Sequence, residues 1–490
     1  KGSAEALQVQ LRALYEMQLQ ATFVFRSDAL QDPKFISLMT QYPEFEKGLF
    51  LEITPQLAHD AGVSYSGSET DWYTAKHAYL LGYTIDERKK IIDTAMQSFH
   101  NVFHMYPKTT AAWMIDAWSL QYLSDEYNVT AHELTRDQWG TDSYTLYGGP
   151  MGTLYQPSKK WPLIPAQGKD ALPLTIFRQT LPDPLWNYGD TSSAFTSQPN
   201  DYALAGKTTK YFADLLIEVL LYQLTPQTVV LGLENSMKRE TQEEFVRQIQ
   251  FLKKFHNEQK KLFVVKTASD AAQARTPSIT VQQGRDVLNS SPGYVPESWW
   301  ITTSAYRARI IHTATQVLLT DVRVYDSTLV DPYISTPTQS QHAYWIVPFA
   351  LDGSRMRLHE EKIQRTFSLF RRAFASIWRL PKTISEPSDV FSDLRSSPVA
   401  VQFPTPIGEV KTMKDGNQYI LNYQSKDGDE KIILTDQEIR HVGRQTPRWN
   451  VSENNIPKDT GASLKFVTKN DETTLTPVLT QTTSWRWLMP

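Results

Sequence analysis

The stretch TTAAWMIDAWSLQYLSDEYNVTAHEL, residues Thr109–Leu134, decides the fold. It contains a short apolar strand that ends at Trp113, an acidic residue at Asp116, a helix, and a second apolar strand. In α/β barrels the reacting groups lie just past the carboxyl ends of the strands. Asp116 is therefore a candidate catalytic residue, and the next question is whether other strand ends supply partners for it.

The first half of the chain repeats this alternation of apolar strands and amphipathic helices. Seven segments have the pattern of strands: 21–25, 47–54, 109–115, 129–134, 173–179, 228–235 and 261–267. Helical patterns separate several of them, as in DERKKIIDTAMQSFHNVF and ETQEEFVRQIQFLKKF. Continuous apolar strands between amphipathic helices predict a parallel sheet that is covered on both faces. Seven such strands in series favour an α/β barrel domain over residues 1–275.

After about residue 275 the pattern changes to that of antiparallel β structure. A polar bridge, ARTPSITVQQGRDVLNSSPGYVPE, leads into alternating segments such as HAYWIVPFAL and GNQYILNYQ. Short alternating strands with turn signals between them predict a C-terminal antiparallel β-sandwich over residues 276–490. One helix is expected inside it at 357–378, because apolar residues recur there at helical spacing.

The composition excludes several classes of function. The 490 residues carry a net charge of −3 without a basic run, so nucleic acid is not an expected partner. The absence of cysteine excludes disulfides, thiolate metal sites and a cysteine nucleophile. No stretch approaches the roughly 18 apolar residues of a membrane span. Aromatic residues make up 12% of the chain, which suits sugar binding as well as core packing.

The chain begins with KGSAEALQVQ, which runs directly into an amphipathic helix without a signal peptide. We therefore expect a mature or trimmed form of the protein. The compartment stays open, and export to the cell envelope is one expectation. The oligomeric state is not indicated by the sequence.

Acidic residues stand at or after the carboxyl ends of several predicted strands. They are Glu52 in FLEIT, Asp116 in WMIDAW, Asp137 and Asp142 in RDQWGTDSY, and Glu234 in GLEN. A barrel would gather them around one mouth. Glycoside hydrolysis needs two carboxyls with separated pKa values, and such a cluster would supply them. Each residue taken alone could instead cap the helix that follows it or bind a loop arginine.

Two of these regions resemble a known family. Residues YPKTTAAWMIDAWSLQYLSDEYNVTAHEL resemble the third signature region of glycoside hydrolase family 57, in which a Trp and, three residues later, the nucleophilic Glu end a barrel strand. Trp113 matches the Trp, and Asp116 takes the place of the nucleophile. TVVLGLENSMKRETQEEFVRQIQFL resembles the fourth region, in which an acidic pair precedes a helix. Glu234 falls on the second acidic position, and the first, which carries the general acid in that family, is Gly232 here.

The resemblance covers roughly residues 5–270 and implies a fold. Family 57 enzymes, the related alpha-mannosidases and the NodB-type polysaccharide deacetylases share a distorted seven-stranded (β/α) barrel, often followed by a β-sandwich. Residues 21–25 and 48–52 are similar to the second and third strands of that superfamily. Its first strand would precede the opening helix and is not in this sequence.

Histidines bear on the deacetylase alternative, because deacetylases of this superfamily bind a metal through an Asp and two His. His100 and His104 lie four residues apart and would share one face of a helix, which is a workable metal geometry. Their helix precedes the third-region strand, whereas the family keeps its pair after the second strand-like segment. We therefore expect no metal and no cofactor. His132, inside an apolar strand, is either a satisfied core residue or a hydrogen-bonding partner for a sugar.

The sequence thus predicts a carbohydrate-active enzyme, a retaining glycoside hydrolase that acts on an oligo- or polysaccharide. Asp116 would attack the anomeric carbon, and Glu234 would protonate the leaving oxygen. The expected substrate-binding residues are Glu52, Trp113, His132, Asp137, Trp139, Asp142, Tyr144, Tyr147 and Asn235. Two alternatives stay open: a metal-dependent polysaccharide deacetylase, and a non-catalytic glycan-binding or envelope protein on the same scaffold.

Overall fold

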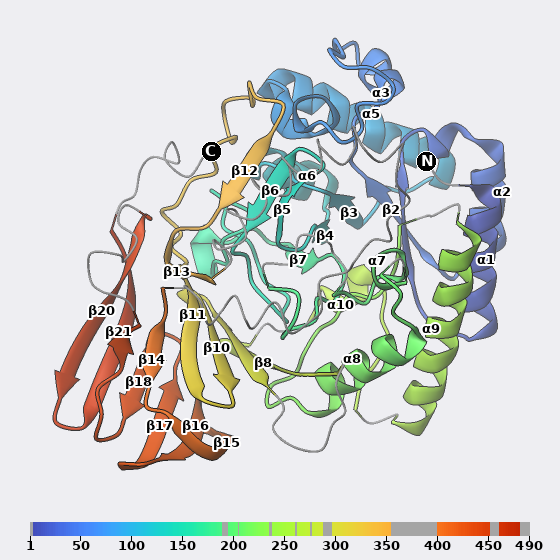
Figure 1. Cartoon of the computed structure of the whole chain (residues 1–490). Coiled ribbons are helices and arrows are strands. Elements are labelled where there is room, and N and C mark those ends of the chain that lie inside the picture. Colours follow the sequence, from blue (N-terminus) through green and yellow to red (C-terminus); the bar gives the residue numbers. More distant parts are fainter. Residues whose placement is uncertain are drawn as a thin grey trace, which may run out of the picture.

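The protein consists of a helix-covered parallel sheet followed by antiparallel β structure (Figure 1). The structure, a computed structural model, describes residues 3–188, 195–203, 205–234, 238–259, 262–274, 277–287, 296–353, 399–450 and 460–480. The side chains of residues 139–141 are not described.

The first part is built on a five-stranded parallel sheet in the order β1-β2-β3-β4-β7 (Figure 1). Its strands are β1 (Thr22–Arg26), β2 (Glu46–Phe50), β3 (Thr109–Ala112), β4 (Ala131–Leu134) and β7 (Thr175–Arg178). β3 and β4 pair in parallel from Thr109 opposite Ala131 to Ala112 opposite Leu134. The strand–helix–strand stretch that decides the fold therefore forms the parallel pair that the sequence predicts.

Two of the seven predicted strands are not strands in the structure. Residues 228–234 and 262–267, where the sixth and seventh were expected, belong to no sheet. Their apolar side chains, including Leu231 and Val265, pack against the main hydrophobic core without a β ladder. An apolar run predicts burial, and here the apolar side chains are only partly buried against the core and pair with no strand. A closed seven-stranded barrel is therefore not confirmed.

Long helices flank the sheet, and their ends are fixed by capping residues. α1 (Ala4–Glu16) begins after Ser3, whose side chain accepts a hydrogen bond from the Ala6 N–H. α5 (Ile85–Phe103) begins with a capping box between Thr84 and Glu87. α6 (Ala117–Tyr127) ends at Asn128, which is left-handed. The other long helices are α2 (Pro33–Gln41), α8 (Thr209–Leu221) and α9 (Arg239–Glu258), and α9 lies beside α1 (Figure 1).

Short helices complete the connections of the first part. They are η1 (Ala29–Gln31), α3 (Pro55–Asp60), α4 (Ala75–Ala78), η2 (Leu80–Gly82), η3 (Gly168–Asp170), α7 (Pro199–Tyr202) and α10 (Ala268–Ala271). Within the described ranges, no helix combines the length and the apolar character that crossing a bilayer requires.

The second part contains two antiparallel sheets that share one hydrophobic core, which includes Trp299 and Ile310 of one sheet and Leu421 and Ile432 of the other. The first sheet contains β8 (Ile279–Arg285), β9 (Glu297–Thr303), β10 (Tyr306–Thr313), β11 (Gln316–Val324), β13 (Phe349–Asp352), β14 (Val401–Phe403) and β19 (Arg448–Trp449). The second sheet contains β15 (Pro406–Asp415), β16 (Gln418–Ser425), β17 (Gly428–Leu434), β18 (Ile439–Val442), β20 (Ala462–Lys469) and β21 (Glu472–Leu479). The predicted antiparallel β domain is present, and the helix predicted at 357–378 lies outside the described residues.

A small third sheet connects the two parts. β5 (Gln138–Thr141) and β6 (Tyr144–Tyr147) form a hairpin after β4, and β12 (Ala343–Ile346) pairs in parallel with β6. β12 comes from the range that the sequence assigned to the sandwich. A strand of the second half of the chain therefore completes a sheet that begins in the first half.

A buried ion network holds the same junction together. Asp137, which follows β4, pairs with Arg178 at 2.7 Å and with Arg307 of β10 at 2.5 Å. Arg307 also pairs with Asp321 of β11 at 3.1 Å, and both side chains are 0% exposed. Burial disfavours the charge of Asp137, but the two guanidinium groups outweigh this effect and lower its pKa to about 2. The predicted substrate-binding residue Asp137 is thus engaged between the two parts of the protein.

Replacing Asp137 by Asn should destabilise the protein by about 3–5 kcal/mol at neutral pH, because two buried guanidinium groups lose their shared carboxylate. The pKa of Asp137 falls from 3.8 to about 2 on folding. The ionised carboxylate therefore stabilises the fold above its unfolded pKa, and this contribution is lost as the pH falls toward 2. Urea unfolding at several pH values should show the difference between wild type and variant shrinking below about pH 5. The exposed Asp415→Asn serves as control, and a difference that stays constant with pH would contradict the assignment.

Candidate functional site

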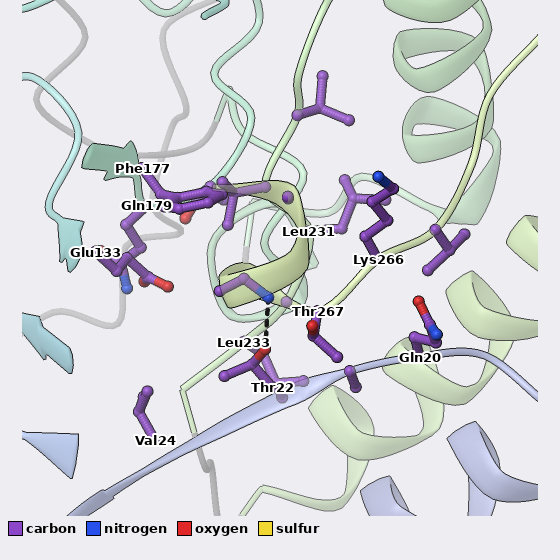
Figure 2. Close-up of a pocket in the computed structure, with 18 of the residues that line it drawn as sticks. Gln20, Thr22, Val24, Glu133, Phe177, Gln179, Leu231, Leu233, Lys266 and Thr267 are labelled. Carbon is purple, nitrogen blue, oxygen red and sulfur yellow. Dashed lines mark hydrogen bonds between the residues drawn. The ribbon is translucent and has the colours of Figure 1, made fainter. Parts of the chain in front are cut away.

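A cavity of about 1120 Å³ lies within the first part, against the inner face of the parallel sheet. One row of residues crosses this face from strand to strand, because paired residues of parallel strands point to the same side. The row consists of Arg26, Phe50, Ala111, Glu133 and Phe177. Figure 2 shows Glu133, Phe177 and Gln179 on one side of the cavity and Leu231 and Lys266 across from them.

Polar side chains gather at the carboxyl ends of the strands. Glu52 comes two residues after β2, Trp113 directly follows β3, and Gln179 directly follows β7. These three residues line the cavity, as do Arg26 at the end of β1 and Glu234. The structure therefore brings together Glu52, Trp113 and Glu234, three of the residues that the sequence singled out. Carboxyl ends of parallel strands are the usual position of reacting groups in α/β folds.

Glu52 is held by two donors from neighbouring strands. The Arg26 guanidinium forms an ion pair with its Oε1, and the Trp113 Nε1–H donates to its Oε2 at 3.1 Å. Arg26 also binds Asp28, with 2.8 Å between Nε and Oδ1. Burial opposes the charge of Arg26, but Asp28 and Glu52 together raise its pKa above the ordinary value. The Glu52 carboxylate and the Trp113 ring are therefore fixed in orientation at the mouth of the cavity.

Glu133 is the carboxyl of this cavity that reasoning from sequence missed. It lies in β4 on the inner face of the sheet and lines the cavity. Burial raises its pKa to about 7, and the charge of Glu234 contributes to the same shift. Near pH 7 roughly half of the molecules therefore carry a proton on Glu133. A carboxyl with such a pKa is suited to general acid catalysis.

Asp116 does not line this cavity. It is the N-cap of α6, is 0% exposed, and accepts hydrogen bonds from the Ser119 N–H at 2.9 Å and the Ser119 hydroxyl at 2.7 Å. The Arg88 guanidinium, also 0% exposed, pairs with it at 2.7 Å. Burial raises the pKa of Asp116, and Arg88 acts in the opposite direction. Its role as nucleophile stays a prediction, and this geometry favours the helix cap that was its alternative.

His132 lies on the opposite face of β4 from Glu133. It is 0% exposed, and its Nδ1 is 2.8 Å from the Thr110 hydroxyl oxygen. Burial lowers its pKa to about 3, so the imidazole is neutral at physiological pH. Of its two alternatives, this environment favours the core residue over the sugar-binding one.

The predicted aromatic platform is only partly at the cavity. Trp113 lines it, whereas Tyr144 and Tyr147 are buried behind it. Tyr144 packs edge-on against Tyr79, with 5.5 Å between ring centroids. Tyr147 lies against Arg307, with 5.5 Å from its ring centroid to the guanidinium carbon. These tyrosines are therefore packing residues and are not part of the cavity lining.

Three further predicted residues are placed differently. Asp142 is exposed in the turn between β5 and β6, where its φ is 48°. Trp139 lies in β5, and its side chain is not among those described. Asn235 lies outside the described residues.

Tyr79 marks the region in which several acidic groups meet. Its hydroxyl is buried and has no hydrogen-bonding partner within the described part of the chain. Burial raises its pKa well above 10, and the charges of Asp142, Glu52 and Glu234 add to this shift. Tyr79 therefore lies within electrostatic reach of all three carboxylates, behind the mouth of the cavity.

The histidine pair does not have the geometry expected of a metal site. His100 is in the last turn of α5, where its ring packs against Tyr106 with 4.9 Å between centroids. His104 is the left-handed residue after α5, with a φ of 58°. The expectation that both lie on one helix face was wrong, because the helix ends at Phe103. Within the described ranges, no three His, Asp or Glu side chains are grouped so as to hold a metal ion.

Comparison of sequences gives no relative: neither a protein-family model nor a curated protein matches this chain. Comparison of structures does identify proteins with a similar fold. A crystal structure from Parabacteroides distasonis, provisionally named a glycoside hydrolase/deacetylase, aligns with a TM-score of 0.51 and 12% identity. The alignment covers 72% of this chain and 84% of that chain. The two proteins share a fold. At 12% identity the likeness shows the fold alone.

A second solved structure is more distant. It comes from Mycobacterium smegmatis, is provisionally named a polysaccharide deacetylase, and aligns with a TM-score of 0.30 and 13% identity. The alignment covers 55% of this chain and 76% of that chain. No argument is built on a likeness of this size.

Replacing Asp116 by Asn distinguishes a structural role from a chemical one. If Asp116 caps α6 and neutralises Arg88, the variant should lose about 3–5 kcal/mol of unfolding free energy, because a buried guanidinium is left without its partner. Urea unfolding followed by circular dichroism measures this loss. Asp125→Asn, at an exposed position of the same helix, is the matched control. A variant with wild-type stability and no activity would restore Asp116 as the nucleophile.

Proposed function

We propose that this protein is a carbohydrate hydrolase whose reacting carboxyls are Glu133 and Glu234. The observation that carries the proposal is that two carboxyls face one cavity at the carboxyl ends of the parallel strands. Burial and the charge of Glu234 raise the pKa of Glu133 to about 7, which supports it. Both residues line the same cavity. Glycoside hydrolysis requires two carboxyls at one site, one of which holds a proton for the leaving group.

The two residues would divide the reaction between them. Glu133 donates its proton to the oxygen of the leaving group, because its raised pKa keeps it partly protonated at neutral pH. Glu234, whose negative charge acts on Glu133, attacks the anomeric carbon in a retaining reaction. This assignment gives Glu234 the role that the sequence predicted for Asp116, and it gives Glu133 the role predicted for Glu234.

The other groups of the mouth would bind and orient the sugar. Trp113 offers an aromatic ring for stacking on a sugar face, and its orientation is fixed by its hydrogen bond to Glu52. Arg26 and Gln179 line the same cavity and carry donors for hydroxyl groups. Glu52 supplies a carboxylate that accepts hydrogen bonds. This proposal keeps Glu52 and Trp113 as substrate-binding residues, as the sequence predicted.

Removal of an acetyl group from a polysaccharide is the second candidate reaction. The solved structure that shares this fold is provisionally named for both reactions, and the fold by itself does not distinguish them. Protonation of a leaving group by Glu133 serves either one. Incubation with a panel of acetylated and deacetylated polysaccharides, with reducing ends and free acetate measured in parallel, separates them. Release of neither product would reject both candidates.

Replacing Glu133 by Gln should lower the rate of hydrolysis by a factor of about 10²–10⁴, because the proton donor is lost. Folding should be unaffected, since Gln has the shape of the protonated Glu. The loss should be smaller with activated leaving groups such as nitrophenol, which need little protonation, and proton NMR of the first-formed anomer should show retention. Glu44→Gln, at an exposed position, is the control. Equal losses with activated and natural leaving groups would contradict the role of Glu133.

The pH dependence of hydrolysis should reflect the titration of Glu133. Its pKa of about 7 predicts that kcat/KM declines as the pH rises above 7, because the acid form disappears. Replacing Glu234 by Gln removes a negative charge that raises this pKa, so Glu133 should then titrate at lower pH. Carbon NMR of labelled glutamate measures the titration without requiring turnover. A titration that does not move in Glu234→Gln would show that the two carboxyls are not coupled.

A further inference from the structure

The cavity continues from its polar mouth into an apolar region, which we call the apolar chamber. Its walls are partly buried or exposed apolar side chains from the end of α8 and the two irregular segments: Leu220, Leu231, Leu233, Leu262, Phe263, Val264 and Val265. The polar residues Gln20, Lys266 and Thr267 line the cavity beside them. Figure 2 shows Leu231 and Leu233 on the opposite side of the cavity from Glu133. The mouth and the chamber form one continuous space of about 1120 Å³.

This space does not match a ligand that is polar throughout. Its volume of about 1120 Å³ is larger than the roughly 300–1,000 Å³ of ordinary ligand pockets, so it has room beyond one sugar ring. Sugar hydroxyls that lay against these apolar side chains would lose hydrogen bonds to water without gaining partners from them. An apolar chain in the same place would gain free energy for each methylene group removed from water.

The apolar surface also reaches the outside of the protein. Leu262 and Val264 line the cavity and are 56% and 69% exposed. Exposed apolar side chains are unremarkable singly, but these two continue the wall of an apolar chamber. A ligand chain therefore has an apolar path between solvent and the chamber.

We propose that the substrate is an amphiphilic carbohydrate, in which a sugar is linked to an alkyl or acyl chain. The sugar lies at the mouth beside Trp113, Glu52 and Glu133, and the chain lies in the apolar chamber. This inference rests on the proposed function, because it takes the mouth as the sugar site. It extends that function by naming the class of substrate.

The chain length of simple glycosides tests the proposal. Methyl, octyl, nonyl and decyl β-D-glucosides and the corresponding maltosides are titrated into the full chain by calorimetry, at concentrations below micelle formation. Affinity should rise roughly fourfold with each added methylene group, from the transfer free energy of about 0.8 kcal/mol per methylene. Equal affinities along the series, or no binding of any member, would overturn the proposal. Equal binding of alkyl sulfates of the same length would overturn the sugar part of it.

Two variants of the chamber sharpen the test. Leu231→Asp places a charge in the chamber wall and should abolish the dependence of affinity on chain length. Leu231→Trp keeps the site apolar and fills it, so it should weaken decyl glycoside binding several-fold relative to wild type even if the Asp variant does not fold. Ile407→Asp, at a residue of the second part that is 60% exposed, is the control. If affinity rises with chain length in both chamber variants as it does in the wild type, the proposal is overturned.

Failure of the proposed function and failure of the proposed substrate class give different results. A chain-length gradient without hydrolysis or deacetylation of any probe would reject the proposed function and leave a binding site for amphiphilic sugars. Turnover of plain oligosaccharides without a gradient would support the proposed function and reject the apolar chain. Both quantities are measured on the same preparation, with thermal unfolding as a check that each variant is folded.

Discussion

Neighbouring residues of a strand point to opposite faces of the sheet, and this constraint positions Glu133 in the candidate site. Because β3, β4 and β7 pair without a shift, Glu133 lies between Ala111 and Phe177 on the inner face. The same pairing turns His132 toward the layer on the other side. A slip of one residue in β4 would exchange the two and remove the carboxyl from the cavity. The chemistry proposed for the cavity therefore depends first on strand register.

The electrostatics of the protein follow from one rule, that a charge removed from water needs an opposite charge beside it. Asp137 has two arginines as partners, and its pKa falls to about 2. Glu133, four residues earlier in the chain, has another carboxylate nearby, and its pKa rises to about 7. Both carboxyls are shielded from bulk solvent, so burial alone does not separate them. The two arginines make Asp137 a structural anion. At Glu133 burial is the larger cause of the raised pKa, and the charge of Glu234 adds to it.

Periodicity was sufficient to predict the five parallel strands and the antiparallel domain, because their apolar residues are buried by the pairing that the pattern indicates. It failed for 228–234 and 262–267, where apolar residues pack against the core without a β ladder. Strand ends pointed to Glu52 and Trp113, which line the cavity, and Glu234 lines it too although its segment forms no strand. The role of Asp116 could not be predicted from the sequence, because a residue between a strand and a helix can face a barrel mouth or cap the helix. The structure decides between these positions, since it shows the buried Arg88 paired with Asp116. Glu133 could have been found from AHEL, where an acidic residue inside an apolar strand must face something polar.

The pairing of β12 with β6 has a consequence for the order of events during synthesis. Ala343 must reach Tyr144 before the small sheet is complete, so the growing chain carries β6 with an unpaired edge until the second half has emerged from the ribosome. An unpaired edge is a template for wrong association. Contacts so distant in sequence also slow folding, because a long loop must close before they form. Cells that make this protein must therefore protect a half-built molecule for as long as the remainder of the chain takes to appear.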